Sequence, residues 1–215
     1  MSLISDGPLT LRERKKRQTM ESVLAVAREM LSEKEYDSIT TKELAARAGI
    51  GEATLFRYVV NKKNLFLLIY EEFFNDVLQA CLDEDAKDTT EHGTAQYYID
   101  RITAMYTSLA GLYKRDPDSG YVYVRDSFSP EDFGQRGLEQ GDRWHALVER
   151  VIRKGQDAGV LRPSPPRLIA QNVHAIYVHE VLATHARRRD PKTIDARLAS
   201  RLEALLEPLN ITAAQ

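Results

Sequence analysis

The sequence predicts an all-α fold, because three observations agree. Apolar residues recur at spacings of three and four along most of the chain, which is the period of one face of an α-helix. Capping signals stand where these patterns begin, and glycines or turn-forming clusters stand where they end. No segment of any length alternates apolar and polar residues as a half-buried strand does. With 43% hydrophobic and 29% charged residues among 215, the chain can bury a core and keep a solvated surface.

A long helix is expected near the start of the chain. Thr10 and Glu13 have the spacing of a capping box, in which each side chain bonds the backbone of the other residue. The apolar residues that follow at helical spacing are Met20, Val23, Leu24, Ala27, Met30 and Leu31. Together these signals predict one amphipathic helix.

Two short helices joined by a tight turn are expected next. Thr40 and Glu43 repeat the capping-box spacing and open the first, and Gly49 ends it because glycine accepts the left-handed conformation that closes helices. The second covers about residues 52–58. Two helices joined in this way form a helix-turn-helix, whose first helix braces the second. Any αα-corner shares this spacing, so a purely structural corner is an open alternative.

The rest of the chain predicts a larger helical domain. A broad apolar stripe follows Asn61, and the Asp-Pro-Asp-Ser-Gly cluster at residues 116–120 predicts a turn. A capping side chain precedes a proline at Ser164 and again at Asp190, an arrangement that opens helices. Helices are therefore expected at about residues 61–81, 98–113, 131–158, 165–188 and 191–207.

Composition limits the compartments and partners that the chain can have. Cys81 is the single cysteine, so no intramolecular disulfide can form. The N-terminal residues 1–11 lack the apolar segment of a signal peptide, and the longest uncharged run, residues 102–113, is shorter than the about 20 residues of a membrane-spanning helix. We therefore expect a cytoplasmic protein with no membrane contact. Residues 1–63 hold 12 Lys and Arg against 9 Asp and Glu, while the remainder holds 18 against 23, which would suit a phosphate-binding N-terminal end.

Several motifs in residues 14–70 are shared with a known family. They are Val23-Leu-Ala-Val-Ala, Tyr36-Asp, Thr40-x-x-Glu-Leu-Ala-x-x-Ala-Gly-Ile, Ala53-Thr-Leu-Phe-Arg-Tyr-Val and Asn61-Lys-Lys-Asn-Leu. In these motifs the chain resembles the tetracycline-repressor (TetR/AcrR-like) family of transcriptional regulators. The resemblance implies a flexible N-terminal arm (1–11), a DNA-binding domain (12–72, with the helix-turn-helix at about 40–59) and a C-terminal domain for effector binding and dimerisation (73–215).

The resemblance also implies which side chains meet DNA. Thr40 would cap the second helix near a phosphate, and Lys62 would bind backbone phosphate as a flexible point charge. Thr54 and Tyr58 would face the major groove from the recognition helix. The full expected set is Thr40, Thr41, Gly51, Glu52, Thr54, Arg57, Tyr58 and Lys62.

Three residues depart from the family pattern. Gly51 stands where the family often has a capping serine, which weakens this helix start. Glu52 would repel phosphate unless it accepts a hydrogen bond from a cytosine amino group. Phe56 replaces a frequent tyrosine and loses a hydroxyl that could reach phosphate. These departures leave the base preference open.

A run of basic residues precedes the first apolar stripe. It consists of Arg12, Arg14, Lys15, Lys16 and Arg17. Such an arm could reach a neighbouring minor groove or the DNA backbone. A solvated, disordered arm is an equally good interpretation.

Aromatic residues of the larger domain suit an effector pocket. Their apolar bodies and polar tips fit a mostly apolar ligand, although each one alone also fits ordinary core packing. The expected pocket residues are Tyr98, Met105, Tyr106, Tyr113, Phe128, Trp144 and Tyr177. We expect a small apolar or aromatic effector.

The resemblance implies a homodimer held by the last two predicted helices, which would meet their copies in a four-helix arrangement. Both helices carry apolar stripes that allow this, although the stripes could instead pack within one subunit. The expected interface residues are Ile169, Val173, Ile176, Tyr177, Leu198, Leu202 and Leu205.

Two classes of function fit these patterns. The first is a ligand-responsive DNA-binding regulator, a repressor that binds a palindromic operator as a dimer and is released by an effector. The second is a small all-helical enzyme whose His145, Glu149 and tyrosines form a site, with the corner merely structural. His145 and Glu149 provide only half of a metal site, and the sequence has no phosphate loop, nucleophile elbow or paired-carboxylate motif. We therefore expect no catalytic residue, metal or cofactor, and Lys62 after the recognition helix favours the regulator.

Overall fold

The protein is helical throughout the part of the chain that its structure describes. A computed structural model describes residues 10–34, 38–59, 61–90, 92–129 and 132–211. Within these residues no strand forms, and Leu161 and Asn210 make an isolated bridge. The chain divides into two compact units, Met1–Ile69 and Tyr70–Gln215. The predicted all-α fold class is confirmed.

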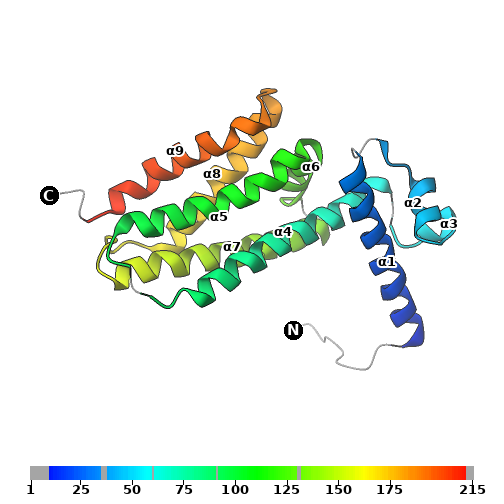
Figure 1. Cartoon of the computed structure of the whole chain (residues 1–215), viewed down its shortest axis with the longest axis horizontal. Coiled ribbons are helices and arrows are strands. Elements are labelled where there is room, and N and C mark those ends of the chain that lie inside the picture. Colours follow the sequence, from blue (N-terminus) through cyan, green and yellow to red (C-terminus); the bar gives the residue numbers. More distant parts are fainter. Residues whose placement is uncertain (1–9, 35–37, 60, 91, 130–131, 212–215) are drawn as a thin grey trace. The chain divides into compact units, whose positions relative to one another are not determined.

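The N-terminal unit is built on three helices and the start of a fourth. They are α1 (Leu11–Glu33), α2 (Thr41–Arg47), α3 (Glu52–Leu55) and α4 (Lys62–Lys87). Figure 1 shows the two short helices α2 and α3 beside the long α1. The side chains that form the core between them are Val23, Ala27, Met30, Leu44 and Leu55.

Both predicted N-caps of this unit form, but only the first completes a capping box, because the Glu43 carboxylate binds Lys34 at 2.5 Å instead. Thr10 Oγ1 accepts a hydrogen bond from the backbone N of Glu13 at 3.3 Å, and Glu13 Oε2 accepts one from the backbone N of Thr10 at 2.8 Å. Thr40 Oγ1 accepts from the backbone N of Glu43 at 3.1 Å. Because a cap satisfies donors that the helix itself leaves unpaired, each is worth about 1 kcal/mol and defines where its helix begins.

The helix α4 belongs to both units. Asn61 Oδ1 accepts a hydrogen bond from the backbone N of Asn64 at 2.8 Å and so caps its first turn. The helix then runs without interruption past Ile69 and Tyr70, where the two units divide (Figure 1). The domain boundary expected after residue 72 also falls within this helix.

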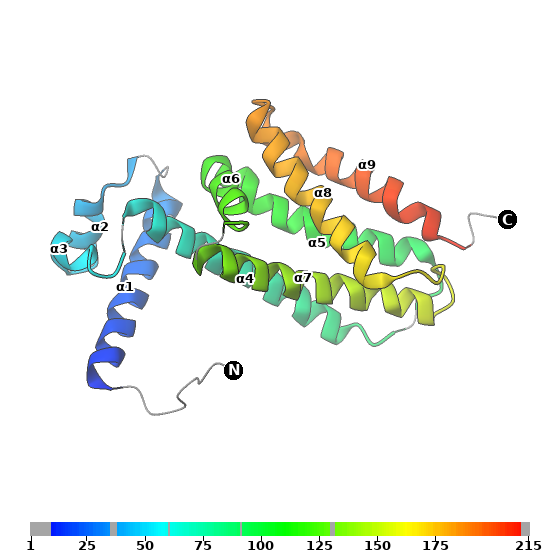
Figure 2. The same cartoon turned by 180° about the vertical axis from the view of Figure 1, so that it is seen from behind.

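The larger unit is a helical bundle. Besides the rest of α4 it contains α5 (Ala95–Arg115), α6 (Pro117–Asp126), α7 (Asp132–Asp157), α8 (Pro166–Ala186) and α9 (Ile194–Leu206), with short 3₁₀ turns at Pro191–Thr193 and Glu207–Leu209. Figure 2 shows α5, α8 and α9 side by side, with α7 against α8. The largest side chains of its core are Tyr98, Ile102, Tyr106, Tyr113 and Trp144.

Two buried carboxylates join helices of this bundle. Asp85 of α4 is bound by Arg150 at 2.5 Å and by Lys154 at 2.9 Å, both on α7. Glu180 of α8 is bound by Arg197 of α9 at 2.8 Å. A buried carboxylate is tolerated only when it is paired and hydrogen-bonded, so these contacts constrain which helices lie together.

The cluster at residues 116–120 starts a helix, and the predicted turn is wrong. Asp116 Oδ1 accepts a hydrogen bond from the backbone N of Ser119 at 3.1 Å, and Pro117 is the first residue of α6. Gly120, read as the end of the turn, is buried inside this helix. An aspartate before a proline opens a turn and a helix equally well, and tertiary packing decides between them.

Neither of the last two helices begins directly after its predicted capping residue. Ser164 does not cap α8, because its Oγ accepts a hydrogen bond from Gln156 Nε2 at 3.1 Å and Pro165 takes the cap position. Asp190 does cap, with Oδ1 accepting from the backbone N of Lys192 at 2.9 Å, but it caps the 3₁₀ turn that precedes α9.

The helices of the described residues are not suited to crossing a membrane. None of them combines the length and the apolar character that a bilayer span requires.

Candidate DNA-binding surface and ligand cavity

The turn between α2 and α3 depends on one glycine and a small apolar corner. Gly49 has a φ of 68°, in the left-handed region that favours glycine. The backbone N of Ile50 donates to the carbonyl of Ala45 at 3.0 Å, which closes the end of α2. Leu44, Ala45 and Leu55 are buried, so α2 braces α3 from its apolar side. This arrangement is the helix-turn-helix that the sequence predicts.

The recognition segment is a shorter helix than the predicted 52–58. The α-helix ends at Leu55, and the chain continues as a hydrogen-bonded turn in which the backbone N of Tyr58 donates to the carbonyl of Leu55 at 2.9 Å. Arg57 is exposed on this turn, and Thr54 and Tyr58 are half-buried. The segment therefore presents the polar side chains expected to meet DNA, although only Arg57 among these three is fully open.

Phe56 is the exposed aromatic residue of this segment. Its side chain is 46% exposed, which is unusual for phenylalanine. Sequence reasoning noted only the hydroxyl that this residue lacks. An exposed phenylalanine has the chemistry to contact the methyl group of thymine.

Two of the expected contact residues bind each other. Thr41 Oγ1 donates a hydrogen bond to Glu52 Oε1 at 2.6 Å. Gly51 takes the N-cap position of α3 without any side-chain bond, as its departure from the family pattern predicts. Because Thr41 holds the Glu52 carboxylate, the orientation of this negative charge at the start of α3 is set by α2.

A basic groove lies between the start of α1 and the recognition segment. We define it by its lining residues Leu11, Arg12, Lys15, Lys16, Arg57 and Tyr58. This lining set holds four cations and no carboxylate, and it joins segments that are more than forty residues apart in sequence. Such a concentration of cations beside a helix-turn-helix is suited to binding DNA phosphates.

The basic residues of the N-terminus lie on a helix. Arg12 to Arg17 form the first turns of α1, so they make neither an extended arm nor a disordered one. The helix contradicts the disordered arm for these residues, while their contact with DNA stays a prediction. Arg17 pairs with Glu21 at 3.4 Å, on the exposed surface of the same helix. The remainder of the expected arm, residues 1–9, lies outside the described residues.

Lys62 is the first residue of α4. Its side chain is half-buried, and its ammonium nitrogen lies 5.8 Å from the centre of the Phe66 ring one turn later. The aromatic ring and the helix geometry hold the lysine at the N-terminal end of α4, which is where the family resemblance expects a phosphate contact.

The larger unit contains a cavity of about 230 Å³, which we call the His174 cavity. It is lined by α4, α6, α7 and α8 and by the link between α6 and α7. Aromatic side chains form much of its wall, and hydroxyl, amide, carboxylate and imidazole groups provide its polar atoms. The residues used below are Phe74, Tyr123, Phe128, Gln140, His174 and Tyr177.

The seven residues expected to form a pocket do not all meet at this cavity. Phe128 and Tyr177 line it. Tyr106 and Trp144 are fully buried directly behind its wall: Trp144 packs edge-on against Phe74, with ring centres 5.7 Å apart. The other three expected residues lie elsewhere in the unit: Tyr98, Met105 and Tyr113.

Most of the cavity wall was missed by sequence reasoning. Gly137 and Gly141 of α7 line the cavity, and Gly134 precedes them on the same helix. A Cβ atom on Gly141 would have His174 Nε2 as its nearest neighbour, 3.9 Å away. Glycine is unfavourable inside helices, so the four glycines of α7, which include Gly155, were a usable sign that other segments approach this helix closely. A Cβ on Gly137 would lie only 2.7 Å from Ser127.

A hydrogen-bond network connects the cavity to α4. Gln140 is buried, and its Oε1 accepts a short hydrogen bond from the hydroxyl of Tyr123. Its Nε2 donates to the carbonyl of Glu71 at 3.1 Å and to Asn75 Oδ1 at 2.9 Å. One side chain of the cavity therefore bonds the backbone of α4 directly after the boundary between the two units.

The histidines and tyrosines of the cavity are uncharged near neutral pH. Burial lowers the pKa of His174 to about 3, with a smaller contribution from His145 nearby. Burial also lowers the pKa of His145 from its usual value. Burial raises the pKa of Tyr123 and Tyr177 far above the usual range. Each shift has the same cause, because loss of water penalises the charged form.

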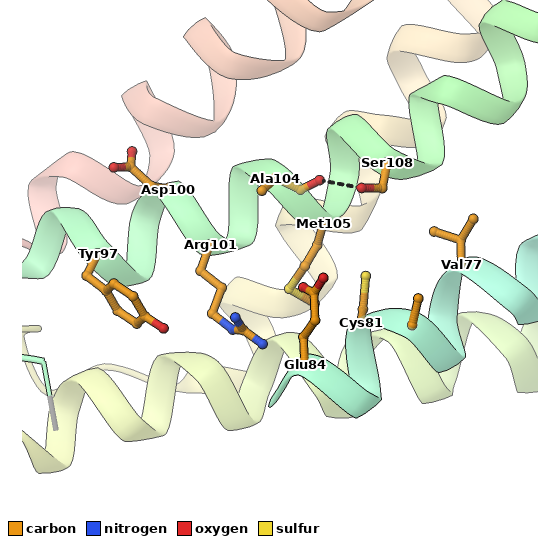
Figure 3. A pocket seen from close by; sticks show the side chains of 10 residues that line it. Val77, Cys81, Glu84, Tyr97, Asp100, Arg101, Ala104, Met105 and Ser108 are labelled. Atoms are coloured by element: carbon orange, nitrogen blue, oxygen red, sulfur yellow. Dashed lines mark hydrogen bonds between the residues drawn. The ribbon is translucent and has the colours of Figure 1, made fainter. Parts of the chain in front are cut away.

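A second, more open hollow of about 540 Å³ lies between α4 and α5, and we call it the Arg101 groove (Figure 3). Met105, expected in the effector pocket, lines this groove with Arg101, and Figure 3 shows both facing Cys81 and Glu84 of α4. Burial raises the pKa of the Cys81 thiol to about 11. The thiol is therefore protonated and has little nucleophilic character.

His145 and Glu149, which the enzyme alternative places in one site, have separate partners. Glu149 is paired with Arg153 at 2.6 Å, while His145 faces Asp142 at 3.4 Å. Across the described residues, no three His, Cys, Asp or Glu side chains are grouped so that they could hold a metal ion. Glu149 does not line the His174 cavity, whereas His145 does.

The expected interface residues are divided between core and surface. Val173, Tyr177, Leu198 and Leu202 are buried within the subunit, so they are not available to a partner. Ile169, Ile176 and Leu205 of the expected set keep accessible surface, as does Leu168. Leu168, absent from the expected set, is 58% exposed.

Comparison with known proteins agrees with this architecture. Residues 23–69 match the sequence model of the family described as bacterial regulatory proteins, tetR family. An uncharacterized HTH-type transcriptional regulator of Bacillus subtilis (strain 168), YdeS, is 24% identical over 141 residues, which cover 64% of this chain and 67% of that protein.

Solved structures share the fold over nearly the whole chain. FadR of Thermus thermophilus, a TetR-family transcriptional repressor solved with lauroyl-CoA, has a TM-score of 0.62 and 18% identity, covering 89% of this chain and 95% of that one. The transcriptional regulator FadR of Bacillus subtilis, solved with stearoyl-CoA, has a TM-score of 0.59 and 18% identity, covering 86% and 97%. These solved structures show the fold, and the family-model match over the helix-turn-helix, together with the curated relative, identifies this chain as a member of the tetR family of bacterial transcriptional regulators.

Proposed function

We propose that this regulator is a repressor, which binds a palindromic operator as a homodimer and leaves it when a small molecule occupies the His174 cavity. This role places the protein in the cytoplasm, where it has access to DNA. The observation that carries the DNA-binding part is the basic groove, because it brings Arg12, Lys15 and Lys16 of α1 beside Arg57 and Tyr58 of the recognition segment. Phosphate-binding cations and groove-facing side chains then act from one surface.

The side chains of this surface divide into positioning and reading groups. Lys62 and the cations of α1 would bind phosphates, which contributes affinity but no sequence preference. Arg57, Thr54 and Tyr58 would reach base edges in the major groove. Glu52, oriented by Thr41, would accept a hydrogen bond from a cytosine amino group with its remaining lone pairs.

Dimerisation is proposed through the outward face of α8 and α9. Leu168, Ile169, Ile176 and Leu205 keep accessible apolar surface there. A two-fold axis would pair each helix with its copy, so that the same patch serves both subunits. Sedimentation velocity of Leu168→Glu should show a monomer at concentrations where the wild type is a dimer, with Ile211→Glu, which also changes a partly exposed apolar residue, as the control.

Small-molecule control is supported by the cavity and by the relatives. Both FadR proteins were solved with an acyl-CoA. In this chain the His174 cavity lies in the corresponding larger unit and is bonded to α4 through Gln140. A ligand that moves α4 would change the distance between the two recognition segments of a dimer, which must match successive major grooves about 34–36 Å apart.

Selection of bound sequences from random DNA tests the proposed function. We expect an enriched palindrome whose half-site centres lie about 10–10.5 base pairs apart or at a multiple of this spacing. Binding to the palindrome should weaken steeply with salt, because phosphate contacts release counterions. Failure to enrich any sequence, with only weak non-specific binding, would overturn the proposal and favour a structural role for the corner.

A further inference from the structure

The orientation of one polar atom in the His174 cavity can be derived from its neighbours. Tyr106 is fully buried, and among the described residues the single hydrogen-bond partner of its hydroxyl is His174 Nδ1, at 3.3 Å. A buried hydroxyl hydrogen without an acceptor is costly, so the hydroxyl donates to Nδ1. The neutral imidazole then carries its proton on Nε2.

This N–H group points toward open space. His174 lines the cavity, and Nε2 is the nearest atom to the position that a Cβ on Gly141 would occupy, at 3.9 Å. No hydrogen-bond partner of Nε2 exists within the described part of the chain. The cavity therefore presents a donor that needs an acceptor, opposite the place where α7 lacks a side chain.

The charge of the lining excludes two classes of ligand. No lysine or arginine lines the cavity, so an anion would lose its hydration without gaining a partner. Asp142 is the single ionised lining residue, and its carboxylate is already bound by Arg167 at 2.7 Å. Burial holds His174 neutral by lowering its pKa to about 3. A cation would meet the Nε2–H donor and find no free carboxylate.

The volume of the cavity and the chemistry of its wall indicate which class of ligand fits. The cavity volume of about 230 Å³ lies below the roughly 300–1,000 Å³ of sites for drug-sized ligands. Phe74, Tyr123, Phe128 and Tyr177 provide flat apolar surfaces. A compact ring system fits such walls better than a long flexible chain, because it loses less conformational freedom on binding.

We propose that the His174 cavity selects a compact, uncharged ring compound whose carbonyl or ether oxygen accepts a hydrogen bond from His174 Nε2. The inference rests on the proposed effector site and narrows its ligand class. Tyr106 acts as a positioning residue, since its hydroxyl determines which imidazole nitrogen carries the proton. Gly141 provides the space that the ligand occupies.

Four matched probes test the ligand class by isothermal titration calorimetry on the full chain. They are the ketone para-methylacetophenone, the hydrocarbon para-cymene, the anion para-toluate and the cation para-methylbenzylammonium. All four contain a para-methylphenyl ring and differ in the second substituent. The ketone should bind about three- to tenfold more tightly than the hydrocarbon, the value of one neutral hydrogen bond. The anion and the cation should bind at least about tenfold more weakly than the ketone. A ketone that binds no more tightly than the hydrocarbon, or an anion that binds equally well, would overturn the proposal.

Substitutions of cavity residues test whether the probes bind in the His174 cavity. His174→Leu should remove the preference for the ketone over the hydrocarbon, while His179→Leu, a change of an exposed histidine on the same helix, should keep it. Gly141→Leu should abolish binding of both neutral probes, because its side chain fills the cavity and also favours the helix. Gly111→Leu on α5, where a Cβ has nothing within 4 Å, is the matched control. Unchanged binding in Gly141→Leu would place the ligand elsewhere and overturn the assignment.

Operator binding, measured on the same preparations, separates this inference from the proposed function. If no neutral probe binds at millimolar concentration while operator binding is intact, the ligand class is wrong and the DNA-binding role stands. If operator binding is absent while the ketone binds as described, the inference stands and the proposed function is wrong.

Discussion

Lys62 offers the simplest test at the scale of a residue. It begins α4 and would contact one backbone phosphate. Lys62→Ala should weaken binding to every DNA sequence by a similar factor and reduce the slope of log affinity against log salt by about one unit. Lys192→Ala, an exposed lysine of the larger unit, should change neither quantity. A change of base preference in Lys62→Ala, measured by fluorescence anisotropy on operator variants, would contradict its assignment to phosphate.

His174 should make the stability of the folded protein depend on pH. Its pKa falls from the usual 6.5 to about 3 on folding, so between these values the unfolded chain binds a proton that the folded chain does not. The contribution of neutral His174 is therefore fully present above pH 6.5 and is lost progressively as the pH falls toward 3. At pH 5 the loss should be about 2 kcal/mol. Urea denaturation between pH 7.5 and 5 should give a shallower decline for His174→Leu than for His179→Leu, and equal declines would contradict the burial of this imidazole.

Paired glycines test helix packing at the scale of the element. A Cβ on Gly120 of α6 would lie 2.6 Å from the hydroxyl of Tyr70 and 3.2 Å from the backbone of Tyr113, whereas a Cβ on Gly111 of α5 would meet nothing within 4 Å. Gly120→Ala should therefore destabilise the protein by about 1–3 kcal/mol through overpacking. Gly111→Ala should stabilise it by about 0.5–1 kcal/mol through helix propensity. Chemical denaturation of both variants checks the opposite signs, and a stabilised Gly120→Ala would show that α6 has room to move away.

How far an element could be predicted depends on whether its signals are local. The caps at Thr10 and Thr40 require only residues within one turn, and both form as expected. The helix start at Asp116 has equally local signals, but Gly120 after it is typical of a turn, and its role in a helix becomes clear only when α4 and α5 pack against it. Local signals therefore predicted that helices exist, while packing determined this boundary.

The two candidate sites also differ in how local their sequence signals are. The helix-turn-helix is contiguous in sequence, so its residues could be named from the motif alone. The His174 cavity is formed by four helices and a link, and no sequence spacing brings Phe74, Gln140 and His174 together. Aromatic residues such as Tyr98 and Tyr113 matched the expected composition of a pocket equally well, and the structure buries them in the core instead. Composition can predict that a pocket exists, but which residues line it depends on how the helices pack.

At the scale of the whole molecule, the proposed function requires that the ligand cavity and the DNA-binding unit influence each other. The shared helix α4 is the covalent connection between the two units. Gln140 is the side chain that bonds both the cavity residue Tyr123 and the α4 residues Glu71 and Asn75. A ligand that displaces Gln140 would therefore disturb α4 directly after the end of the DNA-binding unit.

Gln140→Met tests this connection, because it keeps the size of the side chain and removes its hydrogen bonds. In the wild type we expect bound para-methylacetophenone to lower operator affinity by a coupling free energy of about 1–3 kcal/mol, and operator DNA must lower the affinity for the ketone by the same factor. In Gln140→Met the ratio of operator Kd values with and without ketone should fall toward one, even at ketone concentrations that saturate the cavity. Arg136→Met removes a different contact between α7 and α4, the ion pair with Glu71 at 3.1 Å, and leaves the cavity lining intact, so its ratio should remain close to that of the wild type. A ligand shifts an equilibrium only through contacts that differ between the two states. An unchanged ratio of operator Kd values in Gln140→Met would therefore mean that the ligand acts on α4 through the apolar contact of Phe74 and not through the hydrogen bonds of Gln140.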